Sequence, residues 1–195
     1  VFGADCLSGR GLTDATIRGR KLAYGYYQFY KKYVPGFEKA VFVTTGSVLG
    51  VRETRRILGR HVLRYQDKVD CRRFEDGVMG YDGGPGSDVH ASSASPGDYE
   101  AYADLYKPLQ EEHTSGIATL PYRTLLARHA DNLLVAGRCL SADRKVQGHL
   151  RVIGYCMMMG QVMGLAAAQS LDEGKAPDAI GIRPLQAELQ DLGIL

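Results

Sequence analysis

Two histidines stand at positions from which a side chain could transfer protons. His90 lies in a segment rich in glycine, proline and serine, and His149 directly precedes a long apolar stretch. The unperturbed pKa of histidine is near neutrality, so both residues are candidates for general acid or base catalysis. The alternatives are an exposed loop histidine at position 90 and, at position 149, a side chain that bonds only to backbone.

A cluster of arginines at residues 50–56 (GVRETRR) could bind an anion. If this segment is a strand, Arg52 points to one side and Arg55 to the other, because side chains alternate along a strand. A guanidinium group binds a carboxylate or phosphate through two parallel hydrogen bonds, which makes Arg52 and Arg55 candidate substrate-binding residues. The alternative is a set of surface ion pairs, each of which contributes little stability.

The stretch of residues 150–173 predicts a long apolar helix that carries three glycines. A glycine inside a helix costs about 1 kcal/mol relative to alanine, so these glycines need an explanation. Gly160 and Gly164 lie about one turn apart on one face, where another backbone or a flat ligand can approach closely. The helix follows a loop with His149 and Arg151, and free N–H groups at its start favour an anion. The alternative is a tightly packed core helix without a ligand.

The elements that must position these residues follow from hydrophobic periodicity and turn residues. The pattern predicts helices at residues 13–34, 66–74, 150–173 and 184–193. It predicts strands at residues 40–45, 48–51, 56–64, 117–120 and 133–137. The last of these strands is a continuous apolar run, typical of a strand buried on both faces of an α/β sheet. A polar loop is expected at residues 138–149.

Composition limits the class of protein. The chain has 195 residues, of which 45% are hydrophobic and 24% charged, as in a globular protein with one domain or with one large and one small lobe. The net charge of only +2 does not indicate a nucleic-acid surface, and the chain lacks the run of apolar residues that a membrane span needs. The four cysteines form no CxxC pair, so we expect reduced thiols, no metal site and a cytoplasmic protein.

Six short blocks, taken in their order and spacing, resemble FAD-dependent oxidoreductases of the glutathione-reductase-like type. The blocks are residues 35–38 (PGFE), 50–56 (GVRETRR), 120–123 (LPYR), 132–139 (NLLVAGRC), 147–152 (QGHLRV) and 158–168 (MMGQVMGLAAA). The last three are similar to the flavin-contacting C-terminal segment of that family. The final helix is also similar to the one that ends such proteins, so the resemblance extends from about residue 13 to the end.

The resemblance implies an α/β fold that is the C-terminal part of a two-lobed flavoprotein with FAD as cofactor. Residues 1–118 would supply a portion of the substrate domain and interface elements, and residues 119–195 the C-terminal part of the FAD-binding domain. In such enzymes a turn like the one at Gly137 lies near the ribityl chain and pyrophosphate. The start of the following helix points at N1 and the C2 carbonyl of the flavin, where its dipole stabilises the reduced, anionic flavin. The implied cofactor-binding residues are Gly137, Arg138, Ser141, Gly148, His149, Arg151, Val152 and Ile153.

The resemblance also adds two candidates at residues 120–123. Tyr122 would handle a proton beside the flavin, as a third catalytic candidate with His149 and His90. Arg123 would bind the substrate together with Arg52 and Arg55. The alternative is a strand-exit turn with the tyrosine packed beneath it.

The nucleotide half of an FAD site is missing from the sequence. Members of the family open with a strand and a GxGxxG turn, whose helix start holds the pyrophosphate. No such motif occurs here, and residues 83–86 do not replace it because no apolar strand leads into them. We therefore expect a fragment or subunit whose FAD is completed by an N-terminal FAD-domain chain. A two-chain flavoprotein is favoured, with that chain either a separate subunit or a cleaved half.

The function expected from the resemblance is hydride transfer between a small organic substrate and N5 of the flavin, with a histidine or tyrosine handling the proton. The arginines favour an anionic or hydroxyl-rich substrate. Two alternatives come from other functional classes. One is a non-catalytic scaffold or regulatory subunit derived from a flavoprotein, and the other is a lyase or hydratase in which FAD assists.

Overall fold

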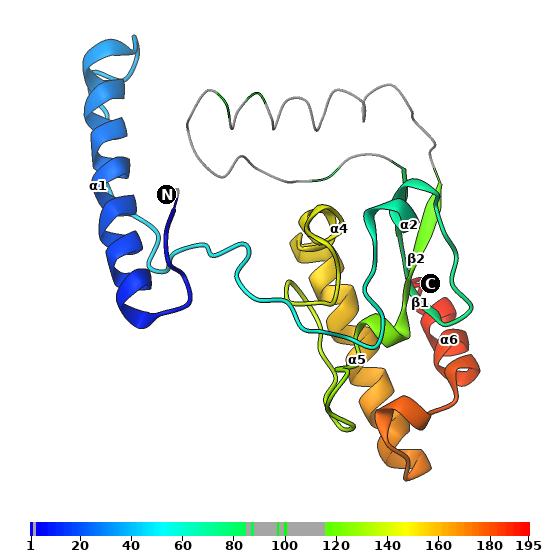
Figure 1. Ribbon diagram of the computed structural model, residues 1–195. Coiled ribbons are helices and arrows are strands. Elements are labelled where there is room, and N and C mark those ends of the chain that lie inside the picture. Colours follow the sequence, from blue (N-terminus) through cyan, green and yellow to red (C-terminus); the bar gives the residue numbers. More distant parts are fainter. Residues whose placement is uncertain (2, 85–86, 88–96, 98–99, 101–115) are drawn as a thin grey trace. The chain divides into compact units, whose positions relative to one another are not determined.

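Two units make up the chain, the first formed by residues 1–54 and the second by residues from 55 to 195 (Figure 1). The computed structural model describes residues 1, 3–84, 87, 97, 100 and 116–195. The candidate His90 lies outside the described residues.

The first unit is built on one long helix, α1 (Gly9–Tyr33). Ser8 caps its start, because the Ser8 hydroxyl accepts a hydrogen bond from the backbone N–H of Gly11 at 3.0 Å. The helix ends where Val34 takes an extended conformation, just before Pro35. The predicted helix at residues 13–34 is confirmed, although it begins at Gly9.

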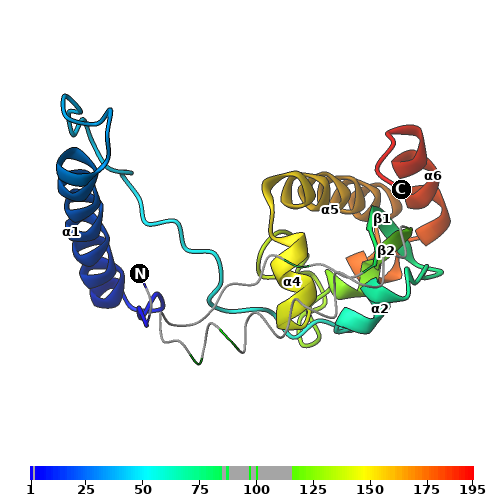
Figure 2. The same cartoon turned by 90° about the horizontal axis from the view of Figure 1, so that it is seen from above.

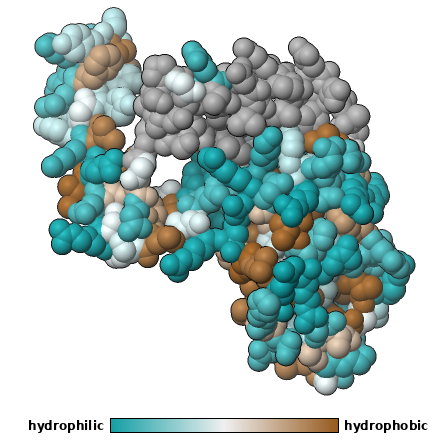
Figure 3. Space-filling view, in the orientation of Figure 1, coloured by the Kyte–Doolittle hydropathy of each residue, from teal (hydrophilic) through white to brown (hydrophobic). Residues whose placement is uncertain are grey.

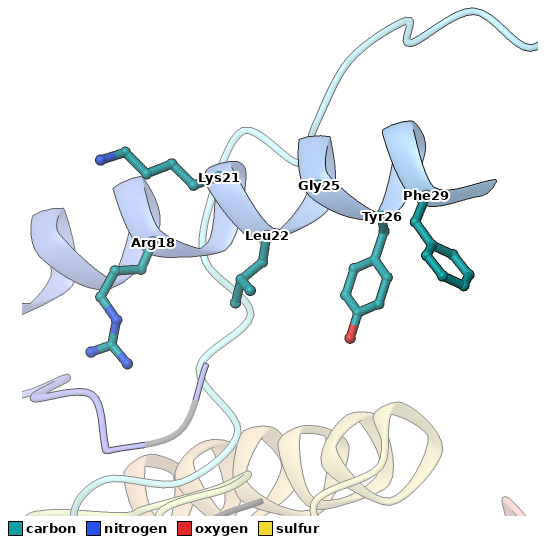
Figure 4. Close-up of a pocket in the computed structure, with 6 residues that line it drawn as sticks. All are labelled: Arg18, Lys21, Leu22, Gly25, Tyr26 and Phe29. Carbon is teal, nitrogen blue, oxygen red and sulfur yellow. The ribbon is translucent and has the colours of Figure 1, made fainter. Parts of the chain in front are cut away.

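Aromatic side chains lie on two sides of α1. Tyr24 and Tyr27 pack against Phe42 of the following segment, with ring centroids 5.6 and 5.5 Å from its ring. Tyr26 and Phe29 are 64% and 52% exposed. They belong to a shallow hollow along the helix that is shown in Figure 4 and lined by Arg18, Lys21, Leu22, Gly25, Tyr26 and Phe29. The helix therefore packs one aromatic cluster against the following segment and leaves a second one open, although Tyr24 of the first cluster is still 48% exposed.

Residues 40–54 form no regular element, so the predicted strands at residues 40–45 and 48–51 are wrong. Val41 and Val43 are 77% and 87% exposed, while Phe42 between them packs on α1. The alternation typical of a strand is thus present. The described residues of the first unit supply no neighbouring strand, and without one the backbone cannot form the hydrogen bonds of a ladder.

A two-stranded antiparallel sheet lies at the centre of the second unit. Strand β1 (Gly77–Asp82) pairs with β2 (Ile117–Pro121), with Met79 opposite Leu120. Both of these side chains are fully buried. The strand predicted at residues 117–120 is confirmed. Strand β1 was not predicted, because its glycines interrupt the apolar pattern.

Two helices cover this sheet and complete the core. Helices α5 (Ile153–Glu173) and α6 (Ile182–Asp191) both pack against β1 and against each other (Figures 1 and 2). Met159 and Leu189 are fully buried where the helices meet the sheet. These two elements confirm the helices predicted at residues 150–173 and 184–193. Shorter elements join them: α2 (Tyr65–Val69), η2 (Tyr122–Thr124), α4 (Arg144–Leu150) and η3 (Pro177–Ala179).

Three other expectations for the second unit need correction. Residues 56–64 form only isolated bridges, at Gly59 and Leu63, and not a strand. The helix predicted at residues 66–74 is limited to α2, because the chain turns at Cys71, which has a positive φ of 49°. The segment at residues 133–137 is not a strand buried on both faces.

The reason for the last correction is the lack of neighbouring strands. Leu134 makes one isolated bridge to Leu126, and Leu133 is 49% exposed. A strand buried on both faces needs partner strands on each side and helices above and below them. The described residues do not supply these elements. The unit mixes helix and strand, which is compatible with the predicted α/β class, but its small sheet is antiparallel.

Within the described residues, no single helix has the length and apolar character needed to cross a membrane. Helices α4 and α5 meet that criterion only when they are taken together as a bent pair.

Candidate functional site

Helix α4 occupies part of the predicted polar loop at residues 138–149, which corrects that prediction. Asp143 starts the helix, because one of its carboxylate oxygens accepts hydrogen bonds from the backbone N–H groups of Lys145 and Val146, both at 3.0 Å. An aspartate at this position satisfies the free N–H groups of a first turn. His149 consequently lies in the last turn of α4.

Helices α4 and α5 meet at a corner of 89° (Figure 2). The N–H of Arg151 still bonds to the carbonyl of Gln147, as in a helix. Val152 then takes an extended conformation with ψ of 153°, so α5 begins in a new direction at Ile153. The predicted long helix therefore starts three residues later than residue 150, and its true start is exposed at the corner.

The first turn of α5 presents free backbone N–H groups. The first hydrogen bond of the helix runs from the N–H of Cys156 to the carbonyl of Val152 at 3.1 Å. The N–H groups of Ile153, Gly154 and Tyr155 therefore have no acceptor inside the helix, and no side chain of the described residues caps them. The first turn also contains no acidic residue. Such a helix start favours an anion or a developing negative charge.

The turn at Gly137 lies against this first turn of α5. Gly137 has φ of 86°, and a Cβ added to it would lie 4.0 Å from the Sγ of Cys156. The N–H of Leu140 closes the turn on the carbonyl of Gly137 at 3.1 Å. Gln147, fully buried in α4, holds the same turn by donating a hydrogen bond to the carbonyl of Arg138 at 2.9 Å. The Gly137 turn is therefore held in place by α4 and lies next to the start of α5.

Three polar side chains meet at the same corner and form the Asp82–His149–Tyr155 cluster. Nε2 of His149 lies 3.2 Å from Oδ1 of Asp82, and the Tyr155 hydroxyl donates a hydrogen bond to the same oxygen. The rings of His149 and Tyr155 are 5.4 Å apart. The ring of Tyr81 lies 6.2 Å from that of His149. Strand β1, helix α4 and helix α5 each supply one member of the cluster.

The environment sets the charge of each member. Burial lowers the pKa of His149 below its usual value and Lys68 lowers it further, while Asp82 acts in the opposite direction. Burial raises the pKa of Asp82, but the hydrogen bond from Tyr155 and the nearby His149 outweigh it, so the pKa lies below its usual value. Burial and the bond to Asp82 raise the pKa of Tyr155 to about 12. At neutral pH the cluster therefore contains a carboxylate, a neutral imidazole and a neutral phenol.

Lys68 of α2 is a buried cation that interacts electrostatically with Asp82 and His149 of the Asp82–His149–Tyr155 cluster. It is 1% exposed, and its Nζ donates a hydrogen bond to the carbonyl of Gly84 at 2.6 Å. Burial lowers the pKa of Lys68, whereas Asp82 raises it. A buried ammonium group needs such partners to stay charged. The lysine thereby fixes the chain just beyond Asp82.

The comparison with known families decides the class of this chain. A family model described as FAD dependent oxidoreductase matches residues 2–189, which is nearly the whole chain. The chain belongs to the FAD dependent oxidoreductase family. This confirms the resemblance and assigns the chain a general FAD-dependent redox function. No similar curated protein and no similar solved structure was found.

In this FAD dependent oxidoreductase, the residues predicted to hold the flavin lie in different surroundings: Gly148 is buried within α4, and Arg151 stands at the end of that helix. Gly137, Val152 and Ile153 form the open turn and helix start described above. Ser141 is 1% exposed, and a Cβ added to Gly59 would lie 2.7 Å from the Cβ of Ser141, so Ser141 packs inside the unit. Direct contact of each residue with FAD stays a prediction.

The three arginines predicted to bind substrate belong to different units. Arg52 lies in the first unit, and Arg55 and Arg123 lie in the second. Nη1 of Arg123 is 3.3 Å from a carboxylate oxygen of Asp76, and its guanidinium group lies 5.5 Å from the ring centre of Phe74. A substrate anion would have to compete with Asp76 for this arginine. Substrate binding by the three arginines stays a prediction.

Tyr122, the third catalytic candidate of this FAD dependent oxidoreductase, is 5% exposed. Its hydroxyl donates a hydrogen bond to the carbonyl of Pro177 at 2.8 Å, and burial raises its pKa to about 12. This placement favours the alternative of a tyrosine packed beneath a strand-exit turn. Of the two candidates that belong to the described residues, His149 is the one that lies at the corner of α4 and α5.

Sequence reasoning missed Asp82, Tyr155 and Lys68. Asp82 and His149 are 67 positions apart, and no local pattern connects them. Asp82 ends a glycine-rich strand that was not predicted. Tyr155 stands in the first turn of α5, where the only available signal was a polar aromatic residue close to a helix start.

Proposed function

We propose that this chain is a subunit or fragment of an FAD-dependent oxidoreductase that transfers a hydride between a small organic substrate and N5 of the flavin. The observation that carries the proposal is the uncapped start of α5 beside the Gly137 turn. Its free N–H groups fit the negative charge that a reduced flavin carries near N1 and the C2 carbonyl. The family match over residues 2–189 supports the same cofactor.

The residues present fit the ring of FAD. Gly137 leaves room for a close approach, because only the Sγ of Cys156 lies within 4 Å of an added Cβ. Ile153, Gly154 and Tyr155 would direct backbone N–H groups at the pyrimidine side of the flavin. When it is bound, FAD supplies the hydride acceptor or donor. His149 would exchange the proton that accompanies the hydride.

The pyrophosphate half of the cofactor requires a further element. The sequence contains no GxGxxG turn, which is the usual pyrophosphate site in such proteins. We propose that an N-terminal FAD-domain chain, either a separate subunit or a cleaved half, supplies it.

The outer face of α5 supports this second part of the proposal. Ile153, Met157 and Leu171 are 79%, 70% and 82% exposed, and Gly160 and Gly164 lie between them without a neighbour within 4 Å of an added Cβ. Figure 3 shows hydrophobic residues scattered among hydrophilic ones on the visible face of the second unit. The opposite face of α5 is buried in the core. A helix that is apolar on all sides is typical of a helix buried on all sides. We therefore assign this outer face to contact with the N-terminal FAD-domain chain.

The redox function is tested on the protein assembled by co-expression with the chain that carries the GxGxxG turn. We expect a yellow complex whose flavin absorbance near 450 nm is lost when an anaerobic sample receives its substrate from a panel of hydroxy acids, polyols and amines. Reoxidation by air should restore the band.

Two results of the same experiment would contradict the proposal. An assembled complex without flavin would favour the scaffold alternative. A flavin that stays oxidised while the complex hydrates or eliminates a panel compound would favour the lyase or hydratase alternative.

A further inference from the structure

The corner of α4 and α5 contains a histidine whose orientation is fixed by two residues with no role assigned so far. We propose that Asp82 and Tyr155 are positioning residues of His149: they hold its Nε2–H on the Asp82 carboxylate and leave Nδ1 as the atom that exchanges a proton with the substrate. This inference rests on the proposed oxidoreductase function.

The proton positions follow from the hydrogen bonds. An ionised carboxylate can only accept, so the contact of 3.2 Å between Nε2 of His149 and Oδ1 of Asp82 requires a hydrogen on Nε2. A neutral imidazole carries one hydrogen, which leaves a lone pair on Nδ1. No hydrogen bond to Nδ1 comes from the described residues. The ring is thus set up to accept a proton at Nδ1.

Tyr155 fixes the carboxylate and the ring together. Its hydroxyl donates to the same Oδ1 that His149 uses, so Asp82 is held between two donors. The ring of Tyr155 lies 5.4 Å from that of His149 on one side, and the ring of Tyr81 lies 6.2 Å away. Tyr155 is also the third residue of α5, and its ring contacts that of His149. The proposed base, His149, therefore lies next to the end of α5 that carries the free N–H groups.

Charged and titratable groups face His149 from every element packed against it. Strand β1 contributes Asp82 and Tyr81, helix α2 contributes Lys68, and helix α5 contributes Tyr155. Burial and Lys68 favour the neutral ring, and Asp82 stabilises the protonated ring once it forms. The imidazole is therefore neutral at neutral pH and ready to accept a proton.

The proton transfer balances for a substrate that bears a hydroxyl group. The bound FAD would accept the hydride together with the electron pair of the broken carbon–hydrogen bond. The hydroxyl proton moves to Nδ1 of His149, and the electron pair of the O–H bond forms the new C=O bond. His149 becomes an imidazolium that Asp82 stabilises, as a carboxylate does for a histidine base in other enzymes. In the reverse direction His149 returns the proton.

The first test measures His149 directly by NMR, in the purified chain, for the wild type, Asp82→Asn and Tyr155→Phe. Asp82 has a side chain that is 68% exposed, so its replacement should leave the fold intact. In the wild type we expect nitrogen shifts of the Nε2–H tautomer. In Asp82→Asn we expect a mixture of tautomers and a lower pKa of His149, because the charge that raises this pKa is gone. In Tyr155→Phe, where Asp82 keeps its charge but loses one donor, we expect a smaller shift toward mixed tautomers. An unchanged tautomer and pKa would overturn the proposal.

The second test measures the rate of anaerobic flavin reduction against pH in the assembled complex. General acid or base catalysis contributes about 10²–10⁴-fold, so we expect His149→Gln to slow reduction by at least about 100-fold and Asp82→Asn by at least about tenfold. Asp172→Asn, an exposed change near the end of α5, is the control and should leave the rate unchanged. A wild-type-like rate and pH profile in Asp82→Asn would overturn the proposal.

The two tests separate this inference from the proposed function. If substrate reduces the flavin but Asp82→Asn has no effect, the oxidoreductase function stands and the positioning role fails. If no substrate reduces the wild-type flavin, the proposed function fails, and the NMR titration still decides whether Asp82 positions His149.

Discussion

Replacing Gly137 with valine is expected to lower the affinity of the assembled protein for FAD at least tenfold. Gly137 has φ of 86°, a region that costs a residue with a Cβ about 1–2 kcal/mol. Strain of this kind destabilises the fold; the affinity for FAD is expected to fall because the valine side chain would fill the space in which the flavin approaches the start of α5, and a loss of about 1.4 kcal/mol corresponds to a factor of ten. A Cβ at position 137 would lie at an ordinary contact distance of 4.0 Å from the Sγ of Cys156, so the two methyl groups of valine would extend into the space beside the first turn of α5. The FAD dissociation constant is measured by the quenching of flavin fluorescence on binding.

Gly174→Val is the matched control for this prediction. Gly174 also has a positive φ, of 59°, but it caps the far end of α5 and has no neighbour within 4 Å of an added Cβ. We expect it to lower the free energy of unfolding and to leave FAD affinity unchanged. If both variants lose affinity equally, backbone strain alone explains the effect and the Gly137 turn is not part of the flavin site.

Met157→Glu is expected to weaken assembly with the proposed N-terminal FAD-domain chain at least tenfold. Met157 is 70% exposed and lies between Ile153 and Gly160 on the apolar face of α5. A carboxylate buried against an apolar partner costs several kcal/mol unless it is paired. Because the residue is exposed in the isolated chain, the substitution should not affect folding. Assembly is followed by size-exclusion chromatography with light scattering.

Leu192→Glu is the control for the face of α5. Leu192 is 50% exposed at the end of α6, outside the proposed contact surface, and carries the same apolar-to-acidic change. Wild-type assembly in Leu192→Glu together with loss of assembly in Met157→Glu supports the assignment. Wild-type assembly in both variants would place the contact surface elsewhere.

Local pattern was enough to predict the long helices and one strand. Helices α1, α5 and α6 have apolar residues at helical spacing and clear stops, and β2 is a short β-branched run that ends in a proline. The segment at residues 40–45 has an equally good strand pattern but remains irregular. Its failure has a physical reason, because a strand depends on a partner that the segment itself cannot supply.

The candidate site was predictable only where it depends on sequence neighbours. His149 and the helix start at Ile153 are close in sequence, and both were identified. Asp143 was missed as a helix cap although an aspartate before a helical run is a known start signal. Asp82 could not be paired with His149, since their contact depends on how β1 packs against the corner of α4 and α5.

We propose that this chain holds the flavin ring of FAD but not the whole cofactor. Equilibrium dialysis of FAD against the isolated chain and against the complex formed with the chain that carries the GxGxxG turn tests it most directly. We predict less than stoichiometric, weak binding to the isolated chain and one tightly bound FAD in the complex. Tight binding of one FAD by the isolated chain would contradict the account.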